Sequence, residues 1–111
     1  MNYRKYGNKE IIVNGIRFQS KKEANRYCEL LLLQRAKIIS NLKLQPRFLL
    51  QEGFKKNGKT YKKIEYIADF QYVENGKVII EDVKGYETEV FKIKHKLFEY
   101  KYPEFELRLV K

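Results

Sequence analysis

Short runs of alternating apolar and polar residues make up much of the chain, and three Asn-Gly pairs separate them. The pairs are Asn14-Gly15, Asn57-Gly58 and Asn75-Gly76, each flanked by strand-forming residues. Asn-Gly between such runs is typical of a two-residue type I′ hairpin turn, in which both residues take positive φ. We therefore expect three β-hairpins, the first between residues 11–13 and 16–18.

A helical period replaces the alternation after the first hairpin. Ser20 and Glu23 form a capping-box sequence, and residues 20–37 are rich in helix formers without Gly or Pro. Apolar residues recur at helical spacing, so much of this helix should be covered by the core. We place the only cysteine, Cys28, in that core as a buried thiol. The apolar positions used are Ala24, Cys28, Leu31 and Leu32.

Thr88 can cap a second helix that runs to about Lys101, because Pro103 follows at the distance expected for a helix stop. Lys94 falls inside the apolar arc of this helix, so it either reaches a phosphate or extends its ammonium to solvent. His95 lies outside the arc, and we expect it to be exposed. The arc consists of Val90, Phe91, Ile93, Leu97 and Phe98.

The remaining apolar runs predict a sheet. A three-stranded meander is expected from residues 47–54, 61–73 and 77–84, and a last strand from residues 104–110. The order of elements is then helix, three strands, helix, strand, which is an α/β arrangement. With 111 residues the chain has the length of one domain, 1–111, in which residues 1–19 form an N-terminal hairpin extension.

The charge balance points to a polyanionic partner. The chain has 24 Lys and Arg against 14 Asp and Glu, a net charge of +10 and a pI near 9.6. Such values are typical of proteins that bind nucleic acid, although a lysine-rich surface can also serve solubility alone.

Other classes of protein are excluded. One cysteine and one histidine cannot form an intramolecular disulfide or a tetrahedral zinc site, so a bound metal would need oxygen ligands. No run of 18 apolar residues and no secretory signal is present. We therefore predict a cytoplasmic protein without a membrane partner.

Charged residues stand in unusual places in two of the predicted strands. Asp82 and Lys84 share one face of their strand, whereas Glu81 points to the opposite face. Folding about the Asn75-Gly76 turn sets Asp69 opposite Asp82. Glu81 is expected to be exposed, unless a bulge turns it toward the two aspartates.

Two facing carboxylates repel each other, and a divalent cation between them resolves the repulsion. Hard oxygen ligands favour Mg²⁺ or Mn²⁺. The alternative is that Asp69 and Asp82 are solvated at a sheet end, with Lys84 as their ion-pair partner.

Asp69, the element Asp82-Val83-Lys84 and the predicted order of helices and strands resemble the PD-(D/E)XK nuclease superfamily. The resemblance covers about residues 20–110, and Ala68 stands where the nominal motif has Pro. Further segments look like small phage-type members, which include proposed Holliday-junction resolvases. These segments are Ser20-Lys21-Lys22-Glu23, Leu44-Gln45-Pro46, Tyr66-Ile67-Ala68-Asp69-Phe70 and Glu81-Asp82-Val83-Lys84-Gly85.

The resemblance implies an αβββαβ restriction-endonuclease-like core, with a mixed sheet flanked by two helices. It also implies a Mg²⁺-dependent deoxyribonuclease. By this resemblance Glu23 completes the metal site, and the competing explanation is that Glu23 caps its helix by reaching the Ser20 backbone N–H. The implied catalytic residues are Asp69, Asp82, Lys84 and Glu23, and the implied metal ligands are Asp69, Asp82, Val83 and Glu23.

For a substrate we expect branched DNA such as a Holliday junction, cut by a homodimer in phage-type recombination inside a bacterial host cell. Exposed apolar surface on the first helix could form the dimer. Alternatives are a sequence-specific, nicking or exonucleolytic enzyme of the same fold, or a nucleic-acid-binding module without catalysis. The expected DNA-binding residues are Lys94, Lys21, Lys22, Arg26, Lys62 and Lys63.

Overall fold

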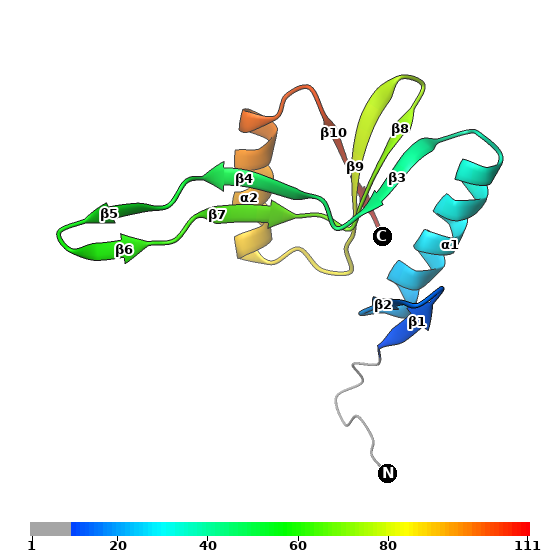
Figure 1. The fold of residues 1–111 in the computed structure, drawn as a ribbon, viewed down its shortest axis with the longest axis horizontal. Coiled ribbons are helices and arrows are strands. Elements are labelled where there is room, and N and C mark those ends of the chain that lie inside the picture. The colour runs from blue at the N-terminus through cyan, green and yellow to red at the C-terminus, as the bar shows by residue number, and fades with distance from the viewer. Residues whose placement is uncertain (1–9) are drawn as a thin grey trace, which may run out of the picture.

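A mixed four-stranded sheet forms the centre of the molecule in the computed structural model, which describes residues 10–111. The strand order is β10-β9-β8-β3; β3 and β9 run antiparallel to β8, and β10 runs parallel to β9 (Figure 1). The bounds are β3 (Ser40–Leu44), β8 (Phe70–Glu74), β9 (Lys77–Val83) and β10 (Glu106–Val110).

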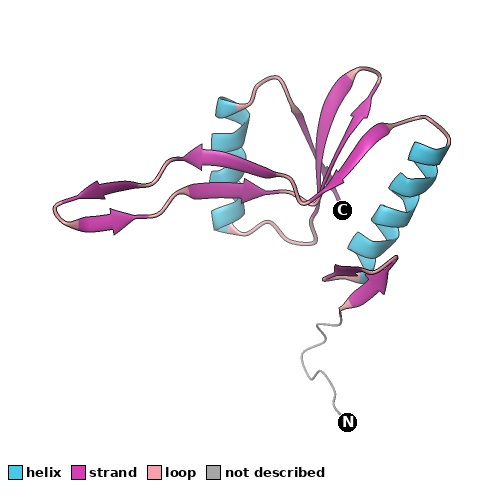
Figure 2. Cartoon of the chain, in the orientation of Figure 1, coloured by secondary structure: helices cyan, strands magenta, loops and turns pink. Residues whose placement is uncertain are grey.

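Two helices, α1 (Lys21–Arg35) and α2 (Glu89–Lys101), begin at the predicted caps (Figure 2). The Ser20 hydroxyl accepts the Glu23 N–H, and the Thr88 hydroxyl accepts the Phe91 N–H. These side chains satisfy N–H groups that have no partner in the first turn of a helix. Over residues 10–111, neither helix is long and apolar enough to cross a membrane.

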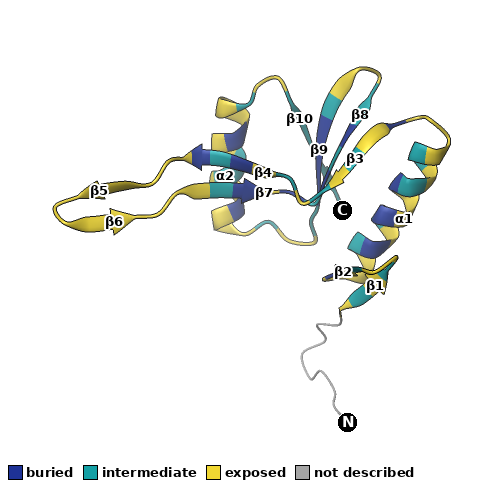
Figure 3. Ribbon diagram, in the orientation of Figure 1, coloured by how far each residue is buried: buried dark blue, intermediate teal, exposed yellow. Residues whose placement is uncertain are grey.

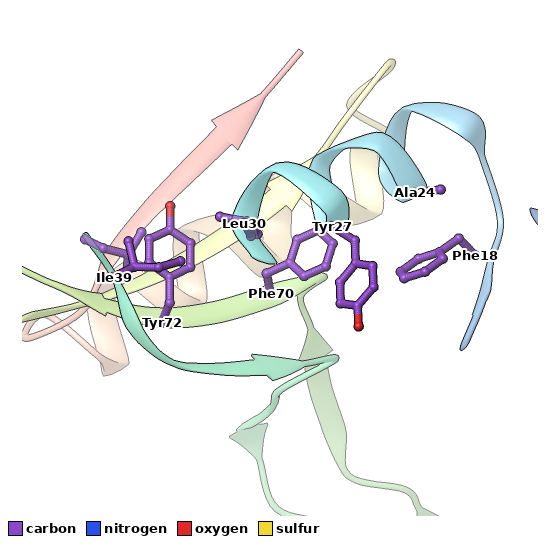
Figure 4. Close-up of a cluster of buried hydrophobic side chains, with 8 residues drawn as sticks. Phe18, Ala24, Tyr27, Leu30, Ile39, Phe70 and Tyr72 are labelled. Atoms are coloured by element: carbon purple, nitrogen blue, oxygen red, sulfur yellow. The ribbon is translucent and has the colours of Figure 1, made fainter. Parts of the chain in front are cut away.

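One face of the sheet packs against α1 (Figure 4). The buried positions of α1 are Ala24, Tyr27 and Leu30, which are three residues apart. Cys28 is exposed, so its predicted place in the core was wrong. It lies about 100° around the helix from Tyr27, which turns the thiol away from the sheet. Leu32, also placed on the core face, is 61% exposed.

The other face of the sheet packs against α2. Phe91 and Phe98 are buried there and are two helical turns apart. The rest of the predicted arc was wrong: Val90, Ile93 and Leu97 are 62%, 60% and 40% exposed. Two large aromatic rings fill the space over the sheet, so the other apolar side chains of α2 remain at the surface. Phe48, Leu50, Tyr66, Ala68 and Ile80 are the other buried residues of this second core.

All three predicted Asn-Gly hairpins are present. They join β1 (Ile11–Val13) to β2 (Ile16–Phe18), β5 (Phe54–Lys56) to β6 (Lys59–Tyr61), and β8 to β9. Each Asn and each Gly of the three turns has a positive φ, between 52° and 78°, as the type I′ turn requires. Residues 1–9 of the predicted N-terminal extension lie outside the described part of the chain.

The predicted meander was wrong in its first two strands: residues 47–51 lie outside the four-stranded sheet, and residues 61–73 are divided among three separate strands. The sheet edge beside β8 is β3, a segment for which no strand was predicted. After β3 the chain leaves the sheet and forms a ladder of β4 (Arg47–Gln51) with β7 (Ile64–Ile67), which the β5–β6 hairpin extends. Along the four-stranded sheet the order is nevertheless α1, β3, β8, β9, α2, β10: helix, three strands, helix, strand.

The β5–β6 hairpin and its two connections, residues 52–63, form what we call the arm. β4 and β7 lie against α2, whereas the arm extends past the body along the longest axis of the molecule (Figure 1). Every residue from 51 to 64 is exposed (Figure 3). The arm therefore contributes nothing to either core.

Candidate active site

The hairpin register brings Asp69 to Asp82, as predicted. In the β8–β9 ladder Phe70 pairs with Glu81 and Glu74 with Lys77. One residue before this ladder, the Asp69 N–H donates to the Glu81 carbonyl at 3.1 Å. The Val83 N–H donates to Asp69 Oδ2 at 2.7 Å, which fixes the Asp69 carboxylate beside the end of β9.

Asp82 lies on the face of β9 that packs toward α2, together with Lys84, and this shared face was predicted. The Asp82 side chain is only 2% exposed. Its Oδ2 accepts a hydrogen bond from the Tyr66 hydroxyl and is 3.6 Å from Lys84 Nζ. Lys84 Nζ also lies 4.4 Å from the centroid of the Phe91 ring, a cation–π contact. The position of the ammonium is therefore fixed by Asp82 and Phe91 together.

Sequence reasoning missed the role of Tyr66. This tyrosine is 2% exposed, and its hydroxyl donates to Asp82. The signal was in the alternation of β7, since Tyr66 has the same parity as the buried Ala68. Burial, followed by the nearby Asp82 charge, raises the pKa of Tyr66, so its hydroxyl remains a donor to the carboxylate.

The two aspartates resist ionising together. Burial, followed by the neighbouring Glu23 carboxyl, raises the pKa of Asp69 to about 6. Burial, followed by contact with Asp69, raises the pKa of Asp82 to about 7. Desolvation and like charge both disfavour the carboxylate form, and a cation would relieve both. Near neutral pH the single ammonium of Lys84 therefore does not compensate both carboxylates at this end of the sheet.

Glu23 caps α1 and also lies close to Asp69. Its carboxylate accepts the Gln19 N–H at 3.1 Å, so it caps α1, one residue earlier than the predicted contact with Ser20. Glu23 and Asp69 both line a cavity of about 430 Å³. The cavity is lined by Glu10, Arg17, Gln19, Glu23, Gln45, Ile67, Ala68 and Asp69.

The donor set determines which metal could be held. No group of three or more His, Cys, Asp or Glu side chains within residues 10–111 is arranged to hold a metal ion by itself. Asp69 and Asp82 still offer two facing carboxylates, of which Asp69 lines the cavity and Asp82 is buried behind it. Val83 could add only its main-chain carbonyl oxygen. Mg²⁺ commonly takes one or two carboxylates and completes its shell with water and phosphate oxygens. The residues present therefore fit Mg²⁺ or Mn²⁺ in the company of a phosphate.

A second cavity, of about 230 Å³, opens beside Lys84. Lys94 of α2 lines it as well, so the two lysines predicted to meet phosphate share one space. Ile67 lines both cavities and separates the acidic one from the basic one. His95 is half-buried rather than exposed; it lies near the Phe91 ring and 3.2 Å from Glu99.

The predicted exposure of Glu81 was wrong. Its side chain is fully buried, because the face of β9 opposite Asp82 is covered by α1. Arg26 Nε and Nη2 donate to its two oxygens at 2.6 and 3.0 Å, and the Tyr72 hydroxyl donates at 2.6 Å. Arg26, predicted to bind DNA, is thus engaged inside the protein, and the bidentate pair raises its pKa.

The other predicted DNA-binding lysines lie at the surface. Lys21 and Lys22 are exposed in the first turn of α1, and Lys62 and Lys63 are exposed on the arm. Exposed apolar residues, which we expected on α1 for a dimer contact, are more prominent on α2. Those of α2 are Val90, Ile93, Leu97 and Tyr100.

Arg26→Ala is expected to destabilise the protein by roughly 3–5 kcal/mol, because it leaves the buried Glu81 carboxylate without its cation. Urea denaturation measures the loss. Glu29→Gln is the matched control: it removes the exposed partner of Arg26, 3.0 Å away, and should change stability by about 0.5 kcal/mol or less. Equal effects of the two substitutions would show that the Arg26–Glu81 pair does not hold α1 to the sheet.

Metal-free protein is expected to lose stability as the pH rises from about 4, the ordinary pKa of aspartate, to about 7. A carboxyl group whose pKa is raised by folding stabilises the fold while it is protonated, and this contribution is lost as pH passes about 6 for Asp69 and about 7 for Asp82. Millimolar Mg²⁺ should raise the thermal midpoint at pH 8 and have little effect at pH 5.

Thermal denaturation with and without Mg²⁺ at both pH values measures this effect. The Asp82→Asn variant is the control, because one charge of the pair is gone and most of the Mg²⁺ response should disappear with it. A stabilisation by Mg²⁺ of the same size at both pH values, or in the variant, would argue against a cation held by these carboxylates.

Comparison with curated proteins and with solved structures found no match for this chain. A family model described as "Protein of unknown function (DUF1064)" matches residues 3–111, which is nearly the whole sequence. The chain belongs to that family.

Proposed function

We propose that this protein is a Mg²⁺-dependent endonuclease that hydrolyses DNA phosphodiester bonds, with Asp69, Asp82 and Lys84 at its centre. One observation carries the proposal: two facing, largely buried carboxylates with an ammonium 3.6 Å from one of them, between an acidic and a basic cavity. A purely structural ion pair would not need a second carboxylate opposite the first.

The order of elements supports the same proposal. α1, three strands, α2 and a parallel edge strand form the arrangement expected of a PD-(D/E)XK nuclease core. Asp69 precedes one hairpin strand and Asp82 lies near the end of the next, where the resemblance requires the two acids. The restriction-endonuclease-like assignment is part of the proposal and depends on this agreement.

Each residue has a definite task in the proposed reaction. When bound, Mg²⁺ would polarise the scissile phosphate and supply positive charge for the transition state. Asp69 and Asp82 would hold the ion, with Val83 N–H and Tyr66 Oη orienting their carboxylates by hydrogen bonds. Lys84, positioned by Asp82 and Phe91, would donate to a phosphate oxygen as charge develops there. Glu23 would bind water or the ion from the acidic cavity.

The basic cavity indicates on which side of the active site the DNA phosphates would bind. Lys94 lines it beside Lys84 and is half-buried, so a phosphate next to the one being cut could enter between them. The acidic cavity on the other side of Ile67 favours a cation over a phosphate. The nucleic-acid backbone would thus cross the end of the sheet with its phosphates toward α2.

Branched DNA is the proposed substrate, cut by a homodimer. Such a substrate requires two active sites for a symmetric pair of cuts, and a domain of this size can recognise the shape of DNA without a separate sequence-reading domain. The rival enzymes are a nicking, sequence-specific or exonucleolytic nuclease with the same centre. The rival without chemistry is a nucleic-acid-binding module.

Labelled synthetic substrates test the proposal: a four-way junction, a duplex and a single strand of matched sequence, incubated with and without Mg²⁺. We expect cleavage that requires Mg²⁺ and favours the junction, with products that map to paired positions on opposite strands. Products from DNA ends would instead indicate an exonuclease. Metal-independent binding with no product on any substrate would contradict the nuclease proposal and favour the binding module.

A further inference from the structure

The arm is the largest feature of the molecule that the proposed active site does not use. It carries five lysines and one glutamate within residues 52–63, all of them exposed. Among the ion pairs of residues 10–111, only Lys63 on the arm has a partner, Glu65 at 3.5 Å. The lysines without a partner are Lys55, Lys56, Lys59 and Lys62.

We propose that the arm is a DNA-binding ribbon that enters the major groove of the duplex flanking the cut site, up to about one helical turn away from it. This inference rests on the proposed function for the position of the cut, and on the arm alone for binding. Its three supports are charge, stiffness and reach.

The unpaired lysines of the arm indicate a polyanionic partner. Four neighbouring ammonium groups without counter-charges repel one another, and a polyanion relieves that repulsion while releasing its own counterions. A second copy of this chain is a poor alternative occupant, since it also has a net charge of +10. An apolar protein surface would have to desolvate the same lysines without pairing them.

The arm is stiff before it binds anything. Phe54 and Tyr61 are a cross-strand pair whose rings stack at 4.7 Å with an angle of 12° between them. Lys59 Nζ lies 5.1 Å from the Tyr61 centroid. Lys56 pairs with Lys59 in the same register, so both ammonium groups share the face of the aromatic pair. The aromatic pair and the Lys59–Tyr61 contact brace the ribbon, and two cations lie on one side of it.

Gly53 lets the two backbone segments of the arm approach each other closely where the arm leaves the body. A Cβ at this position would lie 3.0 Å from the Tyr61 carbonyl oxygen and 3.2 Å from the Lys63 nitrogen, both of them backbone atoms that cannot easily move. The ladder of β4 with β7 ends here and that of β5 with β6 begins. The join is therefore narrow, and the ribbon continues outward from the body.

The width of the ribbon determines which DNA groove it fits, and its length determines how far from the cut site it can bind. A two-stranded ribbon fits the B-DNA major groove, which is about 12 Å wide, and the Asn57-Gly58 turn gives the tip little bulk. Eleven residues separate Gly58 from Asp69, so an extended chain spans at most about 36 Å. One turn of B-DNA is about 35 Å. The tip can thus contact duplex at most about ten base pairs from the phosphate at Asp69.

The test measures binding of the full chain to DNA in EDTA by fluorescence anisotropy. The arm variant combines Lys55→Gln, Lys56→Gln and Lys59→Gln. The matched control combines Lys43→Gln, Lys96→Gln and Lys101→Gln, which are exposed and remove the same charge away from the arm. Each protein is titrated with branched DNA whose flanks are about 16 base pairs, about 5 base pairs, or about 16 unpaired nucleotides.

With long duplex flanks we expect the arm variant to bind about 10- to 100-fold more weakly than wild type, and its plot of log K against log salt to be less steep by about 2 to 3. With short flanks the arm variant and the control should bind alike. Equal binding of the two on long flanks would overturn the proposal. A greater loss on unpaired flanks than on duplex would replace the groove with a single strand as the partner.

The readouts keep this inference separate from the proposed nuclease activity. Flank-dependent binding through the arm with no Mg²⁺-dependent cleavage would overturn the nuclease proposal and leave the arm as a DNA-binding ribbon. Mg²⁺-dependent cleavage that does not change with flank length or with the arm substitutions would support the nuclease proposal and overturn the arm proposal. A wild-type protein that binds none of the substrates would overturn the arm proposal outright.

Discussion

Asp82→Asn is expected to abolish Mg²⁺-dependent cleavage while leaving DNA binding unchanged or tighter. A carboxylate that holds the cation contributes to transition-state stabilisation worth several kcal/mol, which corresponds to at least about 10³-fold in rate. Removing its negative charge also lessens the repulsion of phosphate. The same result is expected for Asp69→Asn, because the two carboxylates face each other and share the cation. Single-turnover cleavage assays, with anisotropy for binding, measure both effects.

Thermal denaturation in EDTA separates loss of the fold from loss of catalysis in the Asp82 variant. Asparagine can still accept the Tyr66 hydroxyl, and it removes a carboxyl group whose pKa is raised by burial and by Asp69. The metal-free variant should therefore be at least as stable as wild type at pH 8. If folded Asp82→Asn or Asp69→Asn protein still cleaves DNA, the assignment of the active site is wrong.

The relation between the two aspartates could be predicted from the sequence because a type I′ turn leaves no freedom of register. Once Asn75-Gly76 is fixed as the turn, Glu74 pairs with Lys77, and every later pair follows by counting. The two-residue period of a strand then separates Asp82 and Lys84 from Glu81. Both steps are local, and both agree with the structure.

Which element packs on each face of a strand depends on residues far away along the chain, and this could not be predicted from the local sequence pattern. Glu81 points away from Asp82 as predicted, but α1 packs over that face and brings Arg26 to it. Fifty-five residues separate Arg26 from Glu81 along the chain. Cys28 shows the converse, since a small apolar residue inside a helical pattern is exposed once Tyr27 and Leu30 have filled the space over the sheet.

The strand β3 was missed because its sequence does not look like a strand. It has only two apolar residues among five, Asn41 has a positive φ of 54°, and the ladder with β8 shifts register between Ser40 and Lys43. Residues 47–51 have a stronger strand pattern but pair with β7, outside the four-stranded sheet. Propensity located β4 and β7 and could not say which segment joins the central sheet.

Lys84→Ala is the substitution that separates chemistry from electrostatic binding, because it removes one ammonium whose position is fixed by the site itself. Lys84 Nζ is 3.6 Å from Asp82 Oδ2 and 4.4 Å from the Phe91 centroid, and its side chain is only 25% exposed. It is therefore held ready to donate to a phosphate oxygen. Losing one preorganised donor of this kind typically costs about 10²–10³ in rate.

Binding should respond far less, since one phosphate contact among many is lost and the exposed lysines of the arm remain. The measurement is the single-turnover rate at saturating protein, together with Kd from anisotropy. Lys96→Ala is the matched control: it removes an exposed lysine on α2 and should leave the rate unchanged. We expect a large fall in rate with a small change in Kd for Lys84→Ala. If rate and affinity fall in proportion, or if cleavage is normal, Lys84 only docks the substrate and the catalytic role of Asp82-Val83-Lys84 has to be abandoned.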